Sequence, residues 1–296
     1  MKEKKNESPA IQCAWRYGVN TTKPDAPLKN KTLFITGASR GIGRAIALRA
    51  AADGANVVIA AKTTVQDDRL PGTIHSVAAE VEAAGGRSLA VVLDIRDEAQ
   101  VASAVRQAAE RFGGIDILVN NASAIHPHGL LDTPVKKYDL MMDINVRGTY
   151  LCSQACMPYL LDSVNPHILT LSPPIDLSPG WFKAHPAYTA SKYAMSMVAL
   201  GIAAEYGDHR ISCNGLWPRT LIGTSALRLA APGMVDRSRK PDIMADAAHW
   251  IFSQAAGSNN GRFFLDEEVL RGAGMTSFDH YLTTPGYEPE IDYFVT

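Results

Sequence analysis

The chain has 296 residues, of which 46% are hydrophobic and 20% charged, an ordinary composition for one large α/β domain. Its 29 Lys and Arg nearly balance its 30 Asp and Glu, so a formal net charge of -1 argues against nucleic acid as a partner. The four cysteines show no CxxC spacing and are typical of reduced thiols: Cys13, Cys152, Cys156 and Cys213.

The sequence also argues against membrane insertion and secretion. No stretch approaches the roughly 20 consecutive apolar residues that a membrane-spanning helix needs. The charged start, residues 1–5, leads into no apolar run, so we expect no secretory signal. The last residues, 292–296, contain no peroxisomal or retention tripeptide. We therefore expect a cytoplasmic protein without membrane insertion.

The first half of the chain alternates apolar runs with helical patterns. Residues 1–28 are polar and proline-containing, which predicts an extended N-terminal arm before a catalytic domain over 29–296. Strands are expected at 32–36, 55–60, 88–93 and 115–119. Helices are expected between them at 44–52, 72–84 and 98–112.

The second half continues the alternation and then weakens. A long helix is expected at 135–161, followed by a strand at 167–171, a helix running to about Tyr206 and a strand at 211–217. A lid is expected at about 218–240, then a helix at 242–255, a strand at 262–265 and a surface tail from about 277. Apolar strands alternating with helices predict one doubly wound Rossmann fold, α/β, with a mostly or wholly parallel sheet of about seven strands.

A glycine turn follows the first apolar run. Gly37, Gly41 and Gly43 lie between that run and an Ala-rich helix, although their spacing differs from GxGxxG. In this position backbone can approach a pyrophosphate, and helix N–H groups point at it. We therefore favour nucleotide binding over a simple tight turn.

The end of the second strand bears on the choice of cofactor. NAD-binding folds place an acid about 20 residues after the glycine turn, where it binds the ribose 2'-hydroxyl. Here Lys62 occupies that region, and Arg40 lies in the glycine turn. Both could bind a 2'-phosphate, so NADP(H) is preferred over NAD(H), although Asp67 and Asp68 follow closely.

Tyr188 and Lys192 are four residues apart on an expected helix, so they share one face. The phenol has an ordinary pKa of about 10, and a neighbouring ammonium favours phenolate and lowers that pKa. The pair is therefore a candidate for moving protons near neutral pH. Alone, it could equally be an accidental pair on an exposed helix.

Five motifs taken together resemble the short-chain dehydrogenase/reductase family. They appear in order as residues 36–43, Asn120-Asn-Ala-Ser123, Asn145, Ser172 and the Tyr188–Lys192 pair, within a similarity over about 30–270. Segments such as 59–63, 140–145, 171–174, 181–183 and 216–218 are most similar to the hydroxysteroid dehydrogenase-like group. Bacterial proteins similar to that group are often assigned to citronellol/citronellal oxidation.

The resemblance implies a role for each matching residue. Tyr188 would be the general acid/base, Lys192 would lower its pKa and bind the nicotinamide ribose, and Ser172 would hold the substrate oxygen. Asn145 would position a water in a proton relay from Lys192. The implied cofactor-binding residues also include Gly37, Ser39, Arg40, Gly41, Ile42, Gly43, Lys62, Asp94, Asn120, Ala122 and Thr220.

Two departures from the family pattern lie close to the expected site. Ser123 replaces the usual glycine, and Arg219 replaces the glycine that usually follows the proline at position 218. Three residues remain open as contacts of the nicotinamide amide, namely Thr220, Ile222 and Thr224. The expected hydrophobic pocket is lined by Trp181, Phe182, Trp217, Leu227 and Leu229.

The sequence favours an NADP(H)-dependent oxidoreductase acting on a hydrophobic alcohol, ketone or aldehyde, such as a terpenoid, a steroid-like or a fatty-chain substrate. A non-catalytic NADP(H)-responsive binding protein and an enoyl-thioester reductase remain alternatives. The resemblance also implies a homotetramer or dimer. His126 and His128 lack the further ligands that a zinc site needs, so no metal is expected.

Overall fold

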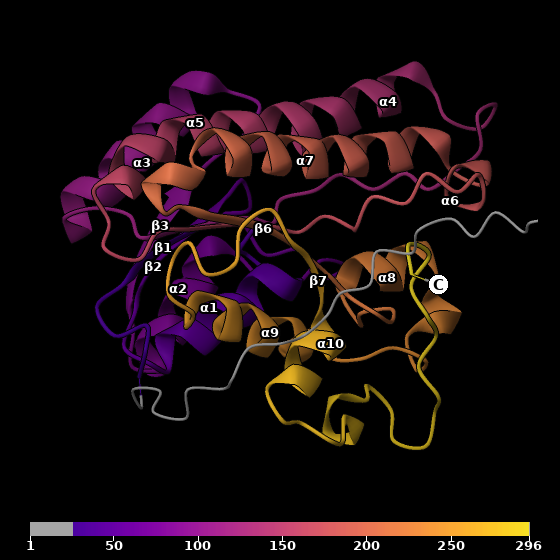
Figure 1. Cartoon of the computed structure of the whole chain (residues 1–296). Helices are drawn as coiled ribbons and strands as arrows, with labels where there is room; N and C mark the ends of the chain where they lie inside the picture. The colour runs from indigo at the N-terminus through magenta and orange to yellow at the C-terminus, as the bar shows by residue number, and fades with distance from the viewer. Residues whose placement is uncertain (1–25, 296) are drawn as a thin grey trace, which may run out of the picture.

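The computed structural model describes residues 26–295, and these form a parallel sheet covered by helices on both faces (Figure 1). The seven strands lie in the order β3-β2-β1-β4-β5-β6-β7, and every pair is parallel. Their bounds are β1 Thr32–Thr36, β2 Asn56–Ala61, β3 Arg87–Val92, β4 Ile117–Asn120, β5 His167–Thr170, β6 Ser212–Trp217 and β7 Phe263–Leu265. The predicted doubly wound fold is confirmed.

Two helical layers enclose this sheet. One layer packs with the core cluster that contains Leu33 and Ile59, and it consists of α1 Gly41–Ala51, α2 Ile74–Ala83, α9 Asp242–Phe252 and α10 Asp266–Gly272. The other packs with the cluster that contains Phe34 and Val58, and it consists of α3 Glu98–Phe112, α5 Gly148–Leu161 and α7 Pro186–Glu205. Consecutive strand residues face opposite layers, which explains why the strands read as continuous apolar runs.

Short elements complete the described chain. They are α4 Val135–Met141, α6 Gly180–Lys183, α8 Ser225–Ala230, the π-helix η1 Met142–Arg147, and the 3-10 turns η2 Gly207–His209, η3 Pro232–Met234 and η4 Asp279–Tyr281. The long helix expected at 135–161 is therefore continuous but contains the π segment. Helix α1 begins three residues earlier than expected, inside the glycine turn.

The two ends of the chain depart from simple surface segments. Most of the predicted N-terminal arm lies outside the described residues, but Leu28 at its end is buried and donates its N–H to Asp53 Oδ2 at 3.1 Å. The tail expected from about 277 is mostly exposed or half-buried, but it buries Phe278, Tyr281 and Phe294, the last in an aromatic cluster. The Phe294 ring stacks on Trp181 of α6, on the right of Figure 1.

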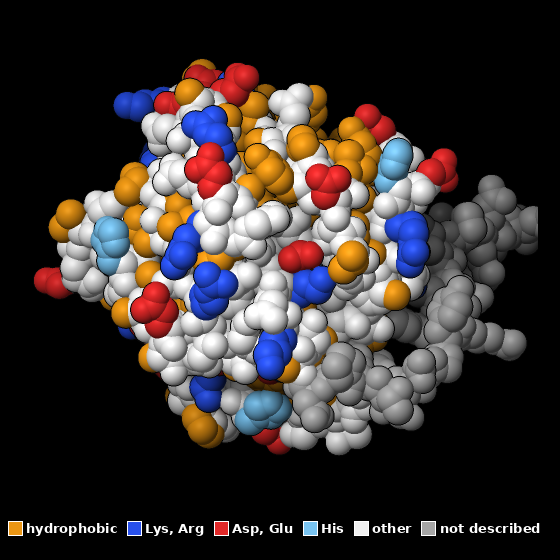
Figure 2. All heavy atoms as spheres, turned by 90° about the vertical axis from the view of Figure 1, so that its left-hand side faces the viewer, with side chains coloured by type: hydrophobic (Ala, Val, Ile, Leu, Met, Phe, Trp, Pro, Cys, Tyr) orange, Lys and Arg blue, Asp and Glu red, His pale blue; other side chains and the backbone are white. Residues whose placement is uncertain are grey.

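The strand order places the functional edge. The chain winds from β1 outward to β3 and then returns to β4 on the other side of β1, so the switch point lies between β1 and β4. Ligands of such sheets bind beyond the carboxyl ends of the strands at this switch point. The opposite end of the molecule, seen in Figure 2, intersperses basic and acidic side chains, in keeping with the balanced composition.

Candidate active site

The glycine turn is packed tightly against the chain that follows β4. Gly37 and Gly41 have φ of 65° and 57°, a region that favours glycine. A Cβ at Gly37 would lie 2.9 Å from Ala122 Cα, and one at Gly43 would lie 2.9 Å from Gly37 O. The turn therefore needs glycine for its backbone conformation and for this close approach.

The beginning of α1 offers backbone donors. Arg40 occupies the N-cap position with extended backbone and makes no side-chain cap hydrogen bond. The first N–H groups of a helix have no intrahelical acceptor and lie at the positive end of the helix dipole. Around them, Ser39 is buried and Ile42 packs against the core, so the predicted pyrophosphate contacts would come from this backbone.

The two cations expected near a 2'-phosphate already have protein partners. Arg40 Nη2 donates to Thr63 Oγ1 at 3.2 Å and to Gly72 O at 3.0 Å. Lys62 Nζ lies 3.6 Å from Asp94 Oδ2, and the lysine side chain is 58% exposed. Because an exposed ion pair is weak, Lys62 can exchange this carboxylate for a ligand at little cost.

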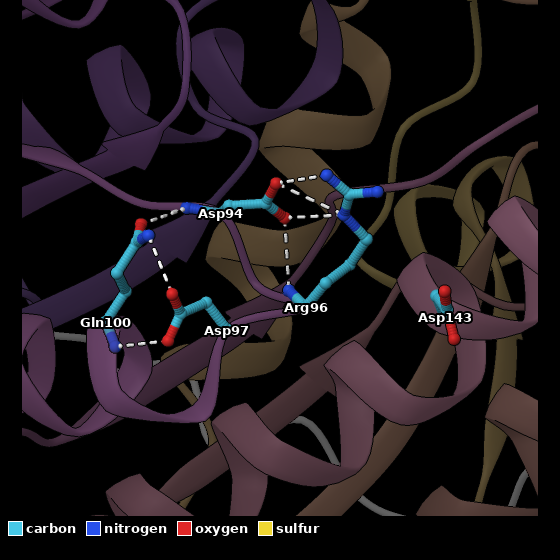
Figure 3. A pocket seen from close by; sticks show the side chains of 5 residues that line it. All are labelled: Asp94, Arg96, Asp97, Gln100 and Asp143. Carbon is cyan, nitrogen blue, oxygen red and sulfur yellow. Dashed lines mark hydrogen bonds and ion pairs between the residues drawn. The ribbon is translucent and has the colours of Figure 1, made fainter.

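Asp94 lies in a hollow beyond β3, where Figure 3 shows it facing Arg96 across paired hydrogen bonds. Arg96 Nη2 is 2.5 Å from Asp94 Oδ2, and this contact lowers the pKa of the carboxyl to about 2. The N–H of Asp94 donates to Gln100 Oε1 at 3.0 Å. The predicted adenine contact would therefore be made by a carboxylate that stays ionised.

The segment after β4 connects the glycine turn to α5. Asn120 Nδ2 donates to Ser153 Oγ at 3.0 Å, while its buried Oδ1 has no partner among the described residues. Asn121 belongs to the Asn120–Ser123 motif but had no expected role, and its Nδ2 donates to Thr36 O at 2.8 Å and Gly37 O at 3.1 Å. An amide directly after a buried strand was the available signal.

Asn145 lies in the π-helix η1, fully buried, with its whole amide used by protein groups. Its Oδ1 accepts from Ala124 N at 2.7 Å and from Ser123 Oγ at 3.1 Å. Its Nδ2 donates to Ala124 O and to Ser191 Oγ, each at 3.0 Å. The side chain therefore holds the β4 loop against α7, and its proposed part in a water relay stays a prediction.

Three residues expected to handle the substrate oxygen occur on β5 and α7. Ser172 follows β5 and is 0% exposed, and its Oγ has no hydrogen-bond partner in the described part of the chain. Tyr188 and Lys192 lie one turn apart on α7 and are 8% and 2% exposed. Lys192 Nζ donates to Leu171 O at 2.5 Å, which brings the lysine to the strand end beside Ser172.

Burial governs the electrostatics of this group. It raises the pKa of the Tyr188 phenol above its ordinary value, and the nearby Asp292 carboxyl adds to the shift. It lowers the pKa of Lys192 to about 7, with Asp292 acting in the opposite direction. The structure therefore does not display the expected lowering at Tyr188, because desolvation disfavours both the phenolate and the ammonium.

The three candidates for the contact with the nicotinamide amide, all in the chain after β6, differ in their hydrogen bonding. Thr220 is buried and its Oγ1 has no partner in residues 26–295. Ile222 forms a bridge with Arg239, and Thr224 caps α8 by accepting from Leu227 N at 3.3 Å. Thr220 is therefore the candidate with free hydrogen-bonding capacity.

Aromatic side chains surround Tyr188. The cluster consists of Met141, Trp181, Tyr188, Tyr193, Trp217, Leu265 and Phe294, with Phe182 packed against it. Two pocket residues expected from the sequence, Trp181 and Trp217, belong to it, whereas Leu229 on α8 is exposed. Phe294 was missed, because nothing in the polar and proline-containing tail distinguishes it from a surface residue.

The potential metal ligands of the described chain lie scattered rather than in a cluster. Residues 26–295 contain no group of three or more potential ligands placed to hold a metal ion. His126 and His128 stack on each other with ring centroids 4.1 Å apart, and Cys152, Cys156 and Cys213 are buried.

Over residues 26–295, no helix combines the length and apolar character required to cross a bilayer.

Comparison with known proteins agrees with this geometry. The family described as short chain dehydrogenase matches residues 31–229. "Hydroxysteroid dehydrogenase-like protein 2" from Danio rerio is 57% identical over 265 residues, which cover 89% of this chain and 63% of that protein. The chain thus spans about 63% of the length of that curated relative.

Solved structures are similar over almost their whole length. A putative dehydrogenase from Xanthomonas campestris superposes with a TM-score of 0.89 at 54% identity, covering 91% of this chain and 99% of that one. A short chain dehydrogenase from Mycobacterium thermoresistibile gives 0.86 at 48% identity, covering 91% and 96%. Such identity over such a span means that the chain belongs to the short-chain dehydrogenase/reductase family of NAD(P)-using oxidoreductases, near its hydroxysteroid dehydrogenase-like group.

Proposed function

We propose that the protein is an NADP(H)-dependent oxidoreductase that interconverts a hydrophobic alcohol and its ketone or aldehyde. The observation that carries this proposal is the unpartnered, fully buried Oγ of Ser172 at the strand end reached by Lys192. A buried hydroxyl without a partner costs about 1–3 kcal/mol. An oxygen of the substrate would satisfy it.

The residues present fit a dinucleotide cofactor. The uncapped N-terminus of α1 suits a pyrophosphate, and the buried oxygens of Asn120 and Thr220 that lack described partners suit ribose and amide groups. When bound, the cofactor supplies the hydride chemistry, while the protein supplies protons and geometry. Arg40 and Lys62 near the end of β2 support NADP(H) over NAD(H).

The chain's own residues would move one proton at the substrate oxygen. Ser172 Oγ would donate a hydrogen bond to that oxygen, and Tyr188 would give it a proton during reduction or take one during oxidation. Lys192, one turn below Tyr188, would favour the phenolate when it is charged. The raised pKa of Tyr188 keeps the phenol protonated near neutral pH, which suits carbonyl reduction.

The apolar surroundings support a hydrophobic substrate. Rings from α6, α7 and the end of β6 gather around Tyr188, and such linings suit hydrophobic alcohols and carbonyls. Terpenoids such as citronellol and citronellal, steroids and fatty-chain alcohols are the classes to compare. A cytoplasmic location is part of this proposal.

A substrate panel tests the activity. Purified protein is assayed with NADP+ and NADPH against alcohols and carbonyls of these three classes, following absorbance of the reduced cofactor. We expect turnover with at least one hydrophobic class and faster reaction with the phosphorylated cofactor. Complete inactivity over the panel, with cofactor still bound, would instead support the non-catalytic binding protein.

We also propose a homo-oligomer formed through η1, α5 and α7. A shallow apolar depression there is lined by Met142, Asp143, Val146, Arg147, Tyr150 and Val198. On the same helices, Tyr150 and Met197 are more than half exposed. Apolar exposure of this kind on neighbouring helices marks an interaction surface. Light scattering of Met197→Glu should give a smaller particle than the parent, and an unchanged mass would contradict this interface.

A further inference from the structure

The C-terminal segment 290–295 returns to the catalytic edge of the sheet. The N–H of Asp292 donates to Arg219 O at 3.0 Å, and the N–H of Leu221 donates to Glu290 O at 2.9 Å. Thr220 and Ile291 form an antiparallel bridge between these two bonds. The segment is therefore paired with the chain directly after β6, and the contact of Phe294 with Trp181 brings it to α6.

The ring of Phe294 occupies the centre of the aromatic cluster and is 5% exposed. It stacks on Trp181 with centroids 6.0 Å apart and meets Trp217 edge-on at 5.5 Å. Its centroid lies 5.9 Å from that of Tyr188, the proposed proton donor. One residue of the tail thus contacts the elements that follow β5 and β6 as well as the reactive tyrosine.

A polar anchor fixes this position. Asp292 Oδ1 accepts from Trp217 Nε1 at 2.6 Å and from the N–H of Phe294 at 3.1 Å. The same indole ring lies under Lys192 Nζ, 5.0 Å from the ring centroid. The carboxylate and the ammonium therefore contact the edge and the face of one side chain, which holds the tail in register with the catalytic group.

We propose that Phe294 is the specificity-determining residue of the active site and limits the bulk of the substrate beside the reacting carbon. This inference rests on the proposed alcohol and carbonyl chemistry. A substrate oxygen that reaches Ser172 and Tyr188 must place its attached carbons against the rings around Tyr188. Phe294 takes up the space into which a fused-ring substrate would extend, so the site selects slender, chain-like alcohols and ketones.

The test compares slender and bulky probes in three variants. Phe294→Ala is expected to raise the ratio of bulky to slender kcat/KM about tenfold, the usual scale for added or removed bulk in an apolar pocket. Phe294→Leu should give an intermediate ratio and serves if the alanine variant folds poorly. Tyr287→Ala, an exposed aromatic residue of the same tail, is the matched control and should leave the ratio unchanged.

Binding provides a readout that does not need turnover. With NADP+ in place of NADPH, so that no ketone is reduced, 2-octanone and a fused-ring ketone are titrated while the tryptophan fluorescence of the protein is followed. We expect Phe294→Ala to gain affinity for the fused-ring ketone about tenfold relative to 2-octanone. If this gain occurs without turnover of either ketone, the proposed activity fails but the role of Phe294 stands. An unchanged affinity ratio in Phe294→Ala and Phe294→Leu would overturn the role of Phe294, whatever the activity.

Discussion

The two ends of the proposed cofactor site differ in how far their charged side chains are exposed to solvent. Beyond β2 and β3, Lys62, Asp94 and Arg96 are partly exposed and pair with one another in reach of water. Beyond β5 and β6, Lys192 and Ser172 are buried, and neither contacts a carboxylate directly. Exposed pairs can rearrange around a ligand at low cost, whereas buried polar groups gain most from a ligand that completes them. We therefore expect affinity and cofactor choice to depend on the first end, and chemistry on the second.

The largest effect is expected at the buried end. Tyr188→Phe removes the hydroxyl that would transfer the proton, so kcat should fall by about 10²–10⁴-fold. NADPH affinity, measured by fluorescence, should stay near that of the parent. Tyr138→Phe on α4, an exposed matched change, should have no effect. A nearly normal rate in Tyr188→Phe would contradict the proposal that the buried end of the site carries out the proton transfer.

Gly37→Ala changes the glycine turn, which packs against the chain after β4 between the exposed and buried ends of the proposed cofactor site. The added Cβ would lie 2.9 Å from Ala122 Cα at a φ of 65°, so we expect a loss of about 2–3 kcal/mol in the free energy of unfolding. Gly201→Ala on α7 meets no atom within 4 Å and should stabilise slightly. Urea denaturation measures both. Equal stability of the two variants would contradict the tight packing of the turn.

Lys192→Met separates stability from activity. The folded pKa of about 7 lies below the ordinary 10.5, so folding loses stability as pH falls from about 10 towards 7. Replacing the ammonium should therefore raise the free energy of unfolding by about 1–3 kcal/mol at pH 6, while kcat falls, though by less than in Tyr188→Phe. This gain should shrink towards pH 10. Lys183→Met on α6, which changes an exposed lysine, should show neither effect.

The smallest effect is expected at the exposed end. Lys62→Asp should weaken NADPH binding about three- to tenfold while changing NADH affinity little, because one screened charge contact is reversed. Titrations at low and high salt measure this, and the difference should decrease with salt. Lys137→Asp on α4 is the control for overall charge. Equal affinity of the parent for NADPH and NADH would contradict the predicted preference itself.

Regular hydrophobic patterns explain what could be predicted. Strands buried on both faces read as apolar runs, and α3 was expected at its observed bounds, 98–112. The Lys62 and Asp94 pair could also have been foreseen, because β2 and β3 are adjacent and end at the same level. The structure places Tyr188 and Lys192 on α7 and brings Lys192 to Leu171 O, next to Ser172, whereas the site that these three residues would form stays a prediction.

Features that depend on tertiary contacts could not be read from the sequence. Phe294 follows no periodic pattern, and its burial results from pairing of the tail with residues 219–221. The pKa of Tyr188 was expected to fall because of Lys192, yet the extent of burial decides it. Neither the depth of a side chain nor the position of a distant tail is encoded in local spacing.

The π-helix at Met142–Arg147 makes the length of the chain between α4 and α5 critical. A π turn contains one residue more than an α turn. Each residue added to or removed from a helix rotates the side chains that follow by about 100°. Deleting one residue here could restore a regular α-helix while turning one helix relative to the other. Asn145 would then lose its alignment with Ser191, or α4 would lose its own packing. We therefore expect this segment to tolerate substitutions at its exposed positions far better than a change of length.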